Sequence, residues 1–320
     1  MRDRDAISKI GFVLVDGFSL MSLSSAVEPL RAANTLSGEA LYSYSYIPIS
    51  GARATASSGA IFEGFSIEDA GYDFDVVFVA AAGNPAAFEN LELFKFLKIL
   101  NSKRVALGGI SGGPVLLAKA GVMDGRRFTV HWDHREALAE ISSELLLERN
   151  IYVIDRDRYT CAGGIAPLDM MSALIARDHG SELAKDVNDW FIHTSVRDSA
   201  HPQRASLVEK YNVHHPAVLS ALELMQNHIS DPLTSLQLAE LSNIGERQLV
   251  RLFKSNLGKG PNRFYRDLRL EHARILVQQS ALSVIEISIA CGFDGASYFA
   301  QVFKEAFGMT PTEMRRKARN

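Results

Sequence analysis

The sequence predicts two domains of different fold class: an N-terminal α/β domain built on a parallel sheet and a C-terminal domain made only of helices. Over residues 10–165, short apolar stretches alternate with stretches of helical period, which is typical of parallel strands joined by crossover helices. After about residue 215 no strand pattern recurs. Several residues in that last part recur 50 positions apart, which indicates one structural unit used twice.

The composition is that of a soluble globular protein. The chain has 320 residues, of which 47% are hydrophobic and 22% are charged, so it has room for two cores. It lacks an apolar stretch of the roughly 18 residues needed to cross a bilayer, and its first residues do not resemble a secretory signal. Cys161 and Cys291 are expected to be buried thiols in a reducing compartment. We therefore expect a cytoplasmic protein without membrane contact.

The elements of the α/β domain follow from apolar runs and helical periods. Strands are expected at 10–15, 46–50, 76–81 and 104–110, with two more near 151–154 and 158–161. Helices are expected near 22–36, 85–100 and 112–120, followed by one that starts by Pro167 and one that ends near His193. Strands that are apolar on both sides belong to a sheet covered on both faces.

A polar segment separates the two domains. Residues 196–215 lack a pattern and contain prolines, so we expect domains at 1–195 and 216–320 joined by this linker. Residues 216–320 hold 13 Lys and Arg and 10 Asp and Glu, a net charge of +3, which leaves −6 for the rest of the chain. This split favours contact of the C-terminal domain with a polyanion, although the excess is small.

The C-terminal domain contains an internal repeat. Phe253-Lys254 recurs as Phe303-Lys304, Gly258 recurs as Gly308, and Pro261 recurs as Pro311. Each copy is interpreted as a helix, a tight turn and a second helix, ended by the glycine and followed by a helix that starts at the proline. The helix between the copies, over 263–279, would set their separation near one turn of DNA.

The second helix of each copy has an apolar inner face and a polar outer face, because Leu249, Leu252 and Phe253 follow helical spacing. Arginine suits guanine, glutamine suits adenine, and lysine binds phosphate. These residue types predict a DNA-binding surface, with a helical protein-interaction domain as the alternative. The candidate residues are Arg247, Val250, Arg251 and Lys254 in the first copy and Ala296, Ser297, Ala300, Gln301 and Lys304 in the second.

The end of the chain also resembles a known family. The stretch GFDGASYFAQVFKEAFGMTPTEMRR is similar to the signature of the AraC/XylS family, and the likeness extends over 216–318. The matching residues are Gly292, Phe293, Ser297, Tyr298, Phe299, Phe303, Lys304, Gly308, Thr310, Pro311 and Arg315. The resemblance implies a unit that places two recognition helices in successive major-groove faces of promoter DNA. It further implies RNA polymerase as a partner and favours activation over repression.

In the N-terminal domain, the expected strand 104–110 enters a sharp turn and then a helix. The turn residues Ser111–Gly113, here called the elbow, would lie at the carboxyl end of the sheet, where α/β proteins bind ligands. The alternative is a glycine-rich turn without a ligand. The region 8–195 resembles the PfpI-like, class I glutamine amidotransferase-like domain, with a flavodoxin-like sheet, of GlxA-type AraC regulators.

This resemblance implies an active site that has lost its chemistry. Catalytic relatives have cysteine where Ser111 lies, often histidine where Gly112 lies, and an acid near Ser22. We therefore expect a non-catalytic pocket without metal or cofactor, in which backbone N–H groups hold a carboxylate and Trp132 lies over a cation. A zwitterion such as an amino acid or a betaine fits this description. The candidate ligand residues are Glu28, Gly83, Asn84, Ser111, Gly112, His131 and Trp132.

Together these features predict a transcriptional regulator that senses a small-molecule effector and forms a homodimer. The helices after Pro167, including residues 186–196, are the candidate dimer surface, with covering of the sheet as their alternative role. Two other classes remain open at this point. One is a hydrolase or amidase that uses Ser111 and carries a DNA-binding module. The other is an architectural DNA-binding protein that ignores metabolites.

Overall fold

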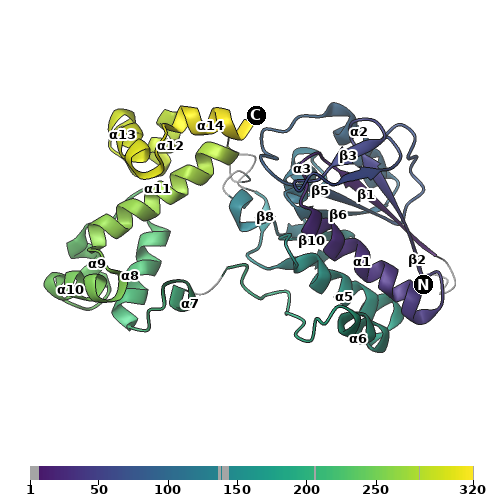
Figure 1. The fold of residues 1–320 in the computed structure, drawn as a ribbon, viewed down its shortest axis with the longest axis horizontal. Coiled ribbons are helices and arrows are strands. Elements are labelled where there is room, and N and C mark those ends of the chain that lie inside the picture. The colour runs from purple at the N-terminus through teal and green to yellow at the C-terminus, as the bar shows by residue number, and fades with distance from the viewer. Residues whose placement is uncertain (1–6, 136–137, 139–143, 205–206, 281, 320) are drawn as a thin grey trace. The chain divides into compact units, whose positions relative to one another are not determined.

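The computed structural model describes residues 7–135, 138, 144–204, 207–280 and 282–319. The contacts within the chain divide it into two compact units, which meet in the sequence between Gln203 and Arg204. Unit 1 contains a sheet with helices, and the described part of unit 2 contains helices alone (Figure 1). Each unit has its own buried core.

Unit 1 is built on a six-stranded sheet with the strand order β2-β1-β5-β6-β10-β9. The strands are β1 (Ser8–Leu14), β2 (Tyr42–Pro48), β5 (Val76–Ala81), β6 (Ala106–Ser111), β9 (Tyr152–Asp155) and β10 (Arg158–Cys161). The first four pair in parallel, as does β10 with β6, whereas β9 pairs antiparallel with β10 at one edge. The predicted parallel α/β architecture is thus confirmed, with an antiparallel edge strand added.

Helices cover both faces of this sheet. On one face, α1 (Leu20–Ser37), α5 (Ala166–His179) and α6 (Ser181–Trp190) pack around Phe12 and Leu14 of β1. On the other, α2 (Leu91–Ser102) and α3 (Gly113–Lys119) pack in one core with Val13 of the same strand and with Val15, which follows it. Successive residues of a strand point to opposite faces, so a strand buried on both faces is apolar throughout.

Four short strands lie outside the main sheet. The strand β3 (Arg53–Thr55) pairs antiparallel with β4 (Ile61–Glu63), and β7 (Arg127–Phe128) pairs in parallel with β8 (Leu146–Leu147). A single 3-10 turn, η1 (Trp132–His134), follows β7. Two- and three-residue strands carry too little pattern for sequence analysis to find.

Two boundaries differ from the expected ones. The strand β2 begins at Tyr42 rather than near residue 46, because the run Tyr42–Ile47 continues the parallel register with β1. The helix α2 begins at Leu91 rather than near 85, because the side chain of Asn90 accepts a hydrogen bond from the N–H of Leu93 at 2.8 Å and caps the helix there.

The polar segment expected to be a linker is partly bound to unit 1. Asp169 of α5 is completely buried, and it accepts hydrogen bonds from the side chains of His193 at 2.9 Å and Arg197 at 2.6 Å. Gln203 is also bound to unit 1, where its side chain donates a hydrogen bond to Thr129. Beyond Gln203 lies α7 (Leu207–Tyr211), and Val213 is fully buried in the core of unit 2. Long-range partners therefore hold much of 196–215, and local composition does not show them.

In unit 2 one long helix belongs to two cores. The remaining helices are α8 (Pro216–Asn227), α9 (Ser235–Leu241), α10 (Glu246–Leu257), α11 (Pro261–Gln279), α12 (Val284–Ala290), α13 (Ala296–Phe307) and α14 (Pro311–Arg319). Phe264 and Tyr265 of α11 pack with α8, α9 and α10, whereas Ala273 and Val277 pack with α12, α13 and α14. Figure 1 shows α10 near the start of α11 and α12 and α14 beside its second half.

Among the described residues, none of the helices combines the length and the apolar character that a membrane span requires.

Candidate functional site

The two copies of the repeat form two helix-turn-helix units, α9 with α10 and α12 with α13. In each copy the first helix begins with a reciprocal capping box, Thr234 with Gln237 and Ser283 with Glu286. The turn residue with positive φ is Asn243 (55°) in the first copy and Gly292 (68°) in the second. The second turn is one residue longer, so the caps repeat at a spacing of 49 and the second helices at 50.

The outer face of α10 is basic. Leu249 and Phe253 are fully buried beneath the helix, and Leu252 packs against the same core. The predicted DNA contacts lie on the other side: Arg247, Arg251 and Lys254 are exposed and Val250 is half-buried. A helix with a rigid apolar seat and an exposed basic face suits insertion into a groove lined by phosphates.

The outer face of α13 is nearly neutral. Phe299 and Phe303 are fully buried. The predicted contacts lie outside: Ser297, Gln301 and Lys304 are exposed, and Ala296 and Ala300 are half-buried. The Nε2 group of Gln301 donates a hydrogen bond to Oε1 of Glu305 at 3.0 Å. Sequence analysis did not anticipate this contact, nor did it place Tyr298, which is 52% exposed, among the candidates.

The separation of the two copies is fixed by more than α11. A Cβ atom on Gly292 would lie 2.7 Å from the carbonyl oxygen of Ile229 and 2.6 Å from Pro232, so the second turn packs directly on the segment before α9. The Nη1 group of Arg269 on α11 donates to the Gly292 carbonyl at 2.6 Å, and its guanidinium lies 4.6 Å from the ring centroid of Phe293. Burial lowers the pKa of Arg269.

In unit 1 the elbow has the strained backbone expected of a sharp strand-to-helix turn. Ser111 has a φ of 61° and is 8% exposed. A Cβ atom on Gly163, after β10, would lie 2.6 Å from the Cβ of Ser111, so only glycine fits there. The N–H of the next glycine, Gly164, donates to the hydroxyl of Ser22 on α1 at 2.8 Å. Ser22, Gly163 and Gly164 thus belong to the site, and the paired glycines after the last strand were the sequence signal for it.

The structure brings most of the predicted ligand residues to this elbow. A Cβ atom on Gly112 would lie 3.0 Å from Pro85, which follows the exposed Gly83 and the half-buried Asn84. On the other side the N–H of His131 donates to the Ser111 carbonyl at 3.3 Å. The rings of His131 and Trp132 are 5.2 Å apart, and both are half-buried. The three segments that carry these six residues therefore meet at the carboxyl end of β6.

Glu28 is not among the residues that the structure brings to the elbow. Ser22 contacts the elbow region from α1, and Glu28 lies six residues further along the helix, about 9 Å away and turned by about 120°. Glu28 instead forms an ion pair with Arg31 at 2.7 Å. It also helps to raise the pKa of Tyr46 on β2, which burial raises most. The carboxylate of Glu28 therefore does not lie where it could pair with the cation of a ligand at the elbow.

The elbow offers fewer backbone donors than expected. The N–H of Gly112 donates to the Ala81 carbonyl at 2.9 Å, and Pro114 has no N–H group. A ligand would therefore depend more on side chains such as those of Ser111 and Asn84. Cys161 lies nearby but is fully buried, and burial raises the pKa of its thiol to about 12. It does not replace the cysteine that the elbow lacks, because the thiolate is the nucleophile.

Gln203 links the His131 segment to the end of unit 1. Its side-chain amide nitrogen lies 3.0 Å from Thr129 Oγ1, 3.0 Å from the carbonyl oxygen of Val130 and 2.7 Å from that of Asn150. Val130 directly precedes His131, whose N–H group is bound to the elbow. Gln203, the last residue of unit 1, is thus connected to the elbow through its hydrogen bond to Val130 and the hydrogen bond of the next residue, His131, to Ser111.

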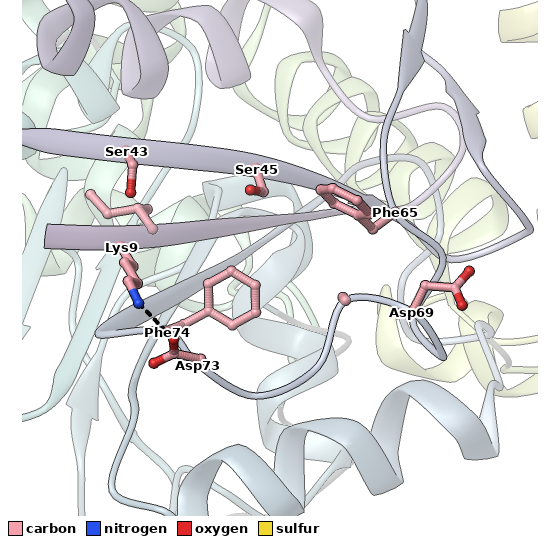
Figure 2. A pocket seen from close by; sticks show the side chains of 9 residues that line it. Lys9, Ser43, Ser45, Phe65, Asp69, Asp73 and Phe74 are labelled. Atoms are coloured by element: carbon pink, nitrogen blue, oxygen red, sulfur yellow. Dashed lines mark hydrogen bonds and ion pairs between the residues drawn. The ribbon is translucent and has the colours of Figure 1, made fainter.

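A separate hollow of about 220 Å³ lies beside the edge strand β2 (Figure 2). Lys9 and Asp73 form an ion pair at 2.6 Å across it, and Asp69 accepts a hydrogen bond from Ser66 at the same distance. Ser43, Ser45 and Phe65 also line it. Its charged groups are therefore already engaged by partners within the chain.

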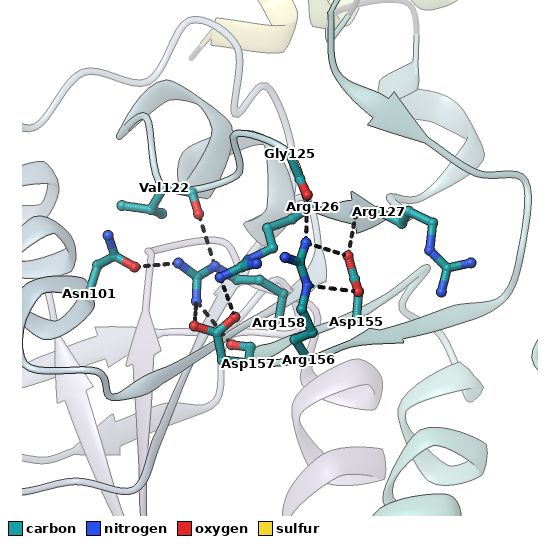
Figure 3. Close-up of polar contacts among 9 residues, drawn as sticks. All are labelled: Asn101, Val122, Gly125, Arg126, Arg127, Asp155, Arg156, Asp157 and Arg158. Carbon is teal, nitrogen blue, oxygen red and sulfur yellow. Dashed lines mark hydrogen bonds and ion pairs between the residues drawn. The ribbon is translucent and has the colours of Figure 1, made fainter.

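A buried arginine occupies the start of β10 (Figure 3). Arg158 is 2% exposed, and burial lowers its pKa. Its guanidinium forms an ion pair with Asp157 at 3.0 Å and donates to the carbonyl of Val122 at 2.9 Å and to the side chain of Asn101. The buried charge is thereby satisfied, and the cluster ties the last turn of α2 and the segment after α3 to the sheet.

Known proteins show the same two parts. A family model described as the DJ-1/PfpI family matches residues 8–177, and one described as a helix-turn-helix domain matches residues 238–317. The HTH-type transcriptional regulator GlxA of Rhizobium meliloti is 41% identical over 317 residues, covering 99% of this chain and 98% of that protein. The HTH-type transcriptional regulator CdhR of Pseudomonas aeruginosa is 38% identical, covering 95% and 90%.

Solved structures resemble a large part of this chain in fold. An AraC family transcriptional regulator from Pseudomonas putida aligns with a TM-score of 0.52 at 25% identity, covering 57% of this chain and 99% of that one. A THiJ/PfpI family protein from Pseudomonas syringae aligns with a TM-score of 0.52 at 20% identity, covering 69% and 87%.

Proposed function

The chain belongs to the helix-turn-helix transcriptional regulators of the AraC type that carry an N-terminal DJ-1/PfpI domain, and from this premise we propose how it works. Its unit 2 binds promoter DNA through α10 and α13. Its unit 1 holds a small metabolite at the elbow, and the liganded protein activates transcription by RNA polymerase.

One observation carries the DNA-binding part: Arg247, Arg251 and Lys254 are exposed on a helix whose opposite side is seated on fully buried Leu249 and Phe253. An exposed basic face on a mobile segment would bind polyanions, but its side chains would have no fixed position relative to the bases. A face held by a core positions side chains against base edges, which is what sequence-specific binding requires.

For the ligand we propose a zwitterion with a carboxylate and an amine or quaternary ammonium group. The hydroxyl of Ser111 and the amide of Asn84 would bind the carboxylate, and the ring of Trp132 would lie over the cation. The half-buried state of Asn84, His131 and Trp132 supports this assignment, since side chains that line a pocket remain partly accessible. Glu28, which pairs with Arg31, takes no part in this proposed site.

We further propose that the elbow is non-catalytic. A serine nucleophile needs a base to take its proton, and the residue next to Ser111 is glycine. The backbone of Ser111, with a φ of 61°, does have the strain of a nucleophile turn, which keeps a hydrolase as the second candidate. Ser111→Ala distinguishes a sensor from a hydrolase. A sensor hydrolyses amides and esters neither as wild type nor as the variant, whereas a hydrolase loses this activity in the variant.

The ligand proposal is tested by calorimetric titration of the full-length protein with amino acids and with carboxylates that carry a quaternary ammonium group. A ligand at 100 times its Kd should add about 2.7 kcal/mol to the free energy of unfolding. Trp132→Ala should weaken binding of such a ligand about 2- to 30-fold, which corresponds to about 0.5–2 kcal/mol. Tyr72→Ala, at an exposed position outside the elbow and the proposed dimer surface, is the control. Failure of every zwitterion to bind would reject this ligand class.

We propose Gln203 as the link between ligand and DNA. Gln203→Ala removes the hydrogen bonds to Thr129, Val130 and Asn150, while the elbow and α10 remain intact. We expect ligand affinity and DNA affinity, each measured alone, to stay within about twofold, and the effect of ligand on DNA affinity to fall. A variant in which the ligand still changes DNA affinity to the wild-type extent would rule out this route.

The chain is proposed to form a homodimer through residues 186–196. Trp190 and Ile192 are 51% and 86% exposed at the end of α6 and beyond it. Neighbouring large apolar side chains in solvent are typical of an interaction surface. Sedimentation equilibrium of Ile192→Asp should then show a weaker dimer than the wild type, and an unchanged association constant would move the interface elsewhere.

A further inference from the structure

Unit 1 contains a second cavity, at the end of the sheet opposite to the elbow. It has a volume of about 290 Å³ and lies between the sheet and helices α1 and α5. Its apolar lining includes Ile10, Leu30, Phe78 and Leu174. Val76, which also lines it, pairs with Ala106 at the start of β6, and Ser111 lies five residues further along that strand. The two places are therefore about 17 Å apart, and the cavity is distinct from the candidate zwitterion site.

One polar group in this cavity has no protein partner. Tyr42 is 5% exposed, and within the described chain its hydroxyl has no hydrogen-bond partner. The ring is held edge-on against His179, with 5.2 Å between the ring centroids. Burial raises the pKa of Tyr42, so the hydroxyl remains protonated and is a donor. Buried hydroxyl groups are normally paired, which points to an acceptor that the chain itself does not provide.

The charges beside the cavity neutralise each other. Arg177 forms an ion pair with Asp178 at 2.7 Å. Its guanidinium lies 5.3 Å from the ring centroid of Tyr159, and its Nη1 group donates to the hydroxyl of that tyrosine at 3.3 Å. Because both charges are already compensated, a charged ligand would gain little here and would lose its hydration.

We propose that this cavity binds a small neutral aromatic compound that carries one carbonyl oxygen. The ring lies among Phe78, Leu30 and Leu174, and the oxygen accepts the hydrogen bond of the Tyr42 hydroxyl. An apolar cavity of about 150 Å³ is sufficient for benzene, and ligand pockets begin at about 300 Å³. The volume here therefore suits a single substituted ring. This site is independent of the ligand proposed for the elbow.

Two probes of nearly equal shape test the proposal: acetophenone, which has the carbonyl oxygen, and ethylbenzene, which lacks it. Binding to the full-length protein is measured by ligand-observed NMR and calorimetry. Acetophenone should bind, and Tyr42→Phe should weaken it about 2- to 12-fold, the loss of one net hydrogen bond, while the affinity for ethylbenzene stays unchanged. Tyr72→Phe, on the surface, is the matched control.

A second variant tests the location. Leu174→Phe enlarges a lining side chain and should abolish binding of both probes, whereas the same change at Leu91, which is 85% exposed, should leave it intact. Should Leu174→Phe fail to fold, as judged by circular dichroism, the conservative Tyr42→Phe result still decides. Absence of acetophenone binding up to its solubility limit, or equal affinity of wild type and Tyr42→Phe, would overturn the proposal and leave a hydrated packing defect.

Discussion

Beneath α10, Leu249 and Phe253 fill the core of the first helix-turn-helix copy, and beneath α13, Phe299 and Phe303 fill that of the second. Both first helices start with a reciprocal capping box, and both second helices end at a glycine with positive φ. The scaffold is thus the same in both copies, because packing and capping restrict which residues fit.

The outer faces are different. The charged residues of α10 are Glu246, Arg247, Arg251 and Lys254, a net charge of +2, whereas Lys304 and Glu305 on α13 cancel. Ser297 and Gln301 take the places that Arg247 and Arg251 hold in the first copy, and alanines take those of Glu246 and Val250. The duplicated scaffold therefore carries two different surfaces. Under the proposed function, the first copy would supply electrostatic attraction, and the second would supply a hydroxyl, an amide and small apolar side chains that suit thymine methyl groups.

The largest expected effect concerns the turns, where the copies also differ. Gly292→Ala forces positive φ on alanine and places its Cβ against Ile229 and Pro232. We expect a loss of about 2–5 kcal/mol in the free energy of unfolding, from strain of about 1–2 and overpacking of about 1–3 kcal/mol. Urea unfolding followed by circular dichroism measures it.

Gly308→Ala is the control for this change, because Gly308 has a similar φ of 75° and open space around it. It should cost only the strain, about 1–2 kcal/mol. Equal losses for the two variants would mean that the packing of the second turn on the first copy contributes nothing to stability.

The next effect concerns DNA affinity. Arg251→Ala should weaken binding to the selected operator by about 1–3 kcal/mol, or about 5- to 150-fold, and relax specificity at one position. Gln301→Ala should cost less than tenfold, because Gln301 must first give up its hydrogen bond to Glu305. Fluorescence anisotropy at fixed salt compares the two.

Salt dependence sharpens the same comparison. Lys254→Ala should weaken binding to all sequences alike and reduce the slope of log K against log salt by about 1. A larger loss for Gln301→Ala than for Arg251→Ala, or an unchanged slope for Lys254→Ala, would contradict the division of roles between the copies.

The repeat was predictable from sequence because both copies obey local rules: apolar spacing, a glycine stop and a proline start. The strand at 76–81 was equally clear, since buried parallel strands are apolar on both faces. The elbow at Ser111 followed from its strand-glycine-helix pattern. In each case the physical cause lies within a few residues of the feature.

The features missed from sequence depend on residues far apart in the chain. Glu28 was assigned to the pocket by its chemistry, but its rotation on α1 places it beside Arg31. Asp169 binds Arg197, and Gln203 binds Thr129. The cavity around Tyr42 is formed by two helices and four strands. No window of sequence contains such a set.

The smallest expected effect concerns the two capping boxes, which are alike in geometry and different in chemistry. Thr234→Ala and Ser283→Ala should each cost about 1 kcal/mol near pH 7. The partner that accepts from the cap N–H is an amide in the first copy, Gln237 at 2.9 Å, and a carboxylate in the second, Glu286 at 2.7 Å. The difference between the costs of Thr234→Ala and Ser283→Ala should therefore change with pH.

Hydrogen bonds from the backbone N–H and the side chain of Ser283 lower the pKa of Glu286 below its ordinary value of 4.5. A group with a lowered pKa in the folded state stabilises above its ordinary pKa, and this contribution is lost as the pH falls through the folded value. The cost of Ser283→Ala should therefore shrink on acidification from pH 6 to pH 3, while that of Thr234→Ala stays constant. Glu286→Gln replaces the carboxylate by an amide, as in the first capping box, and should remove the pH dependence of the Ser283→Ala cost. The pKa of Glu313 is lowered in the same way by Thr310. Glu313 is present in both proteins of each comparison, so its contribution to the pH dependence of stability cancels. A Ser283→Ala cost that is as constant with pH as that of Thr234→Ala would mean that the carboxylate of Glu286 takes no part in the cap.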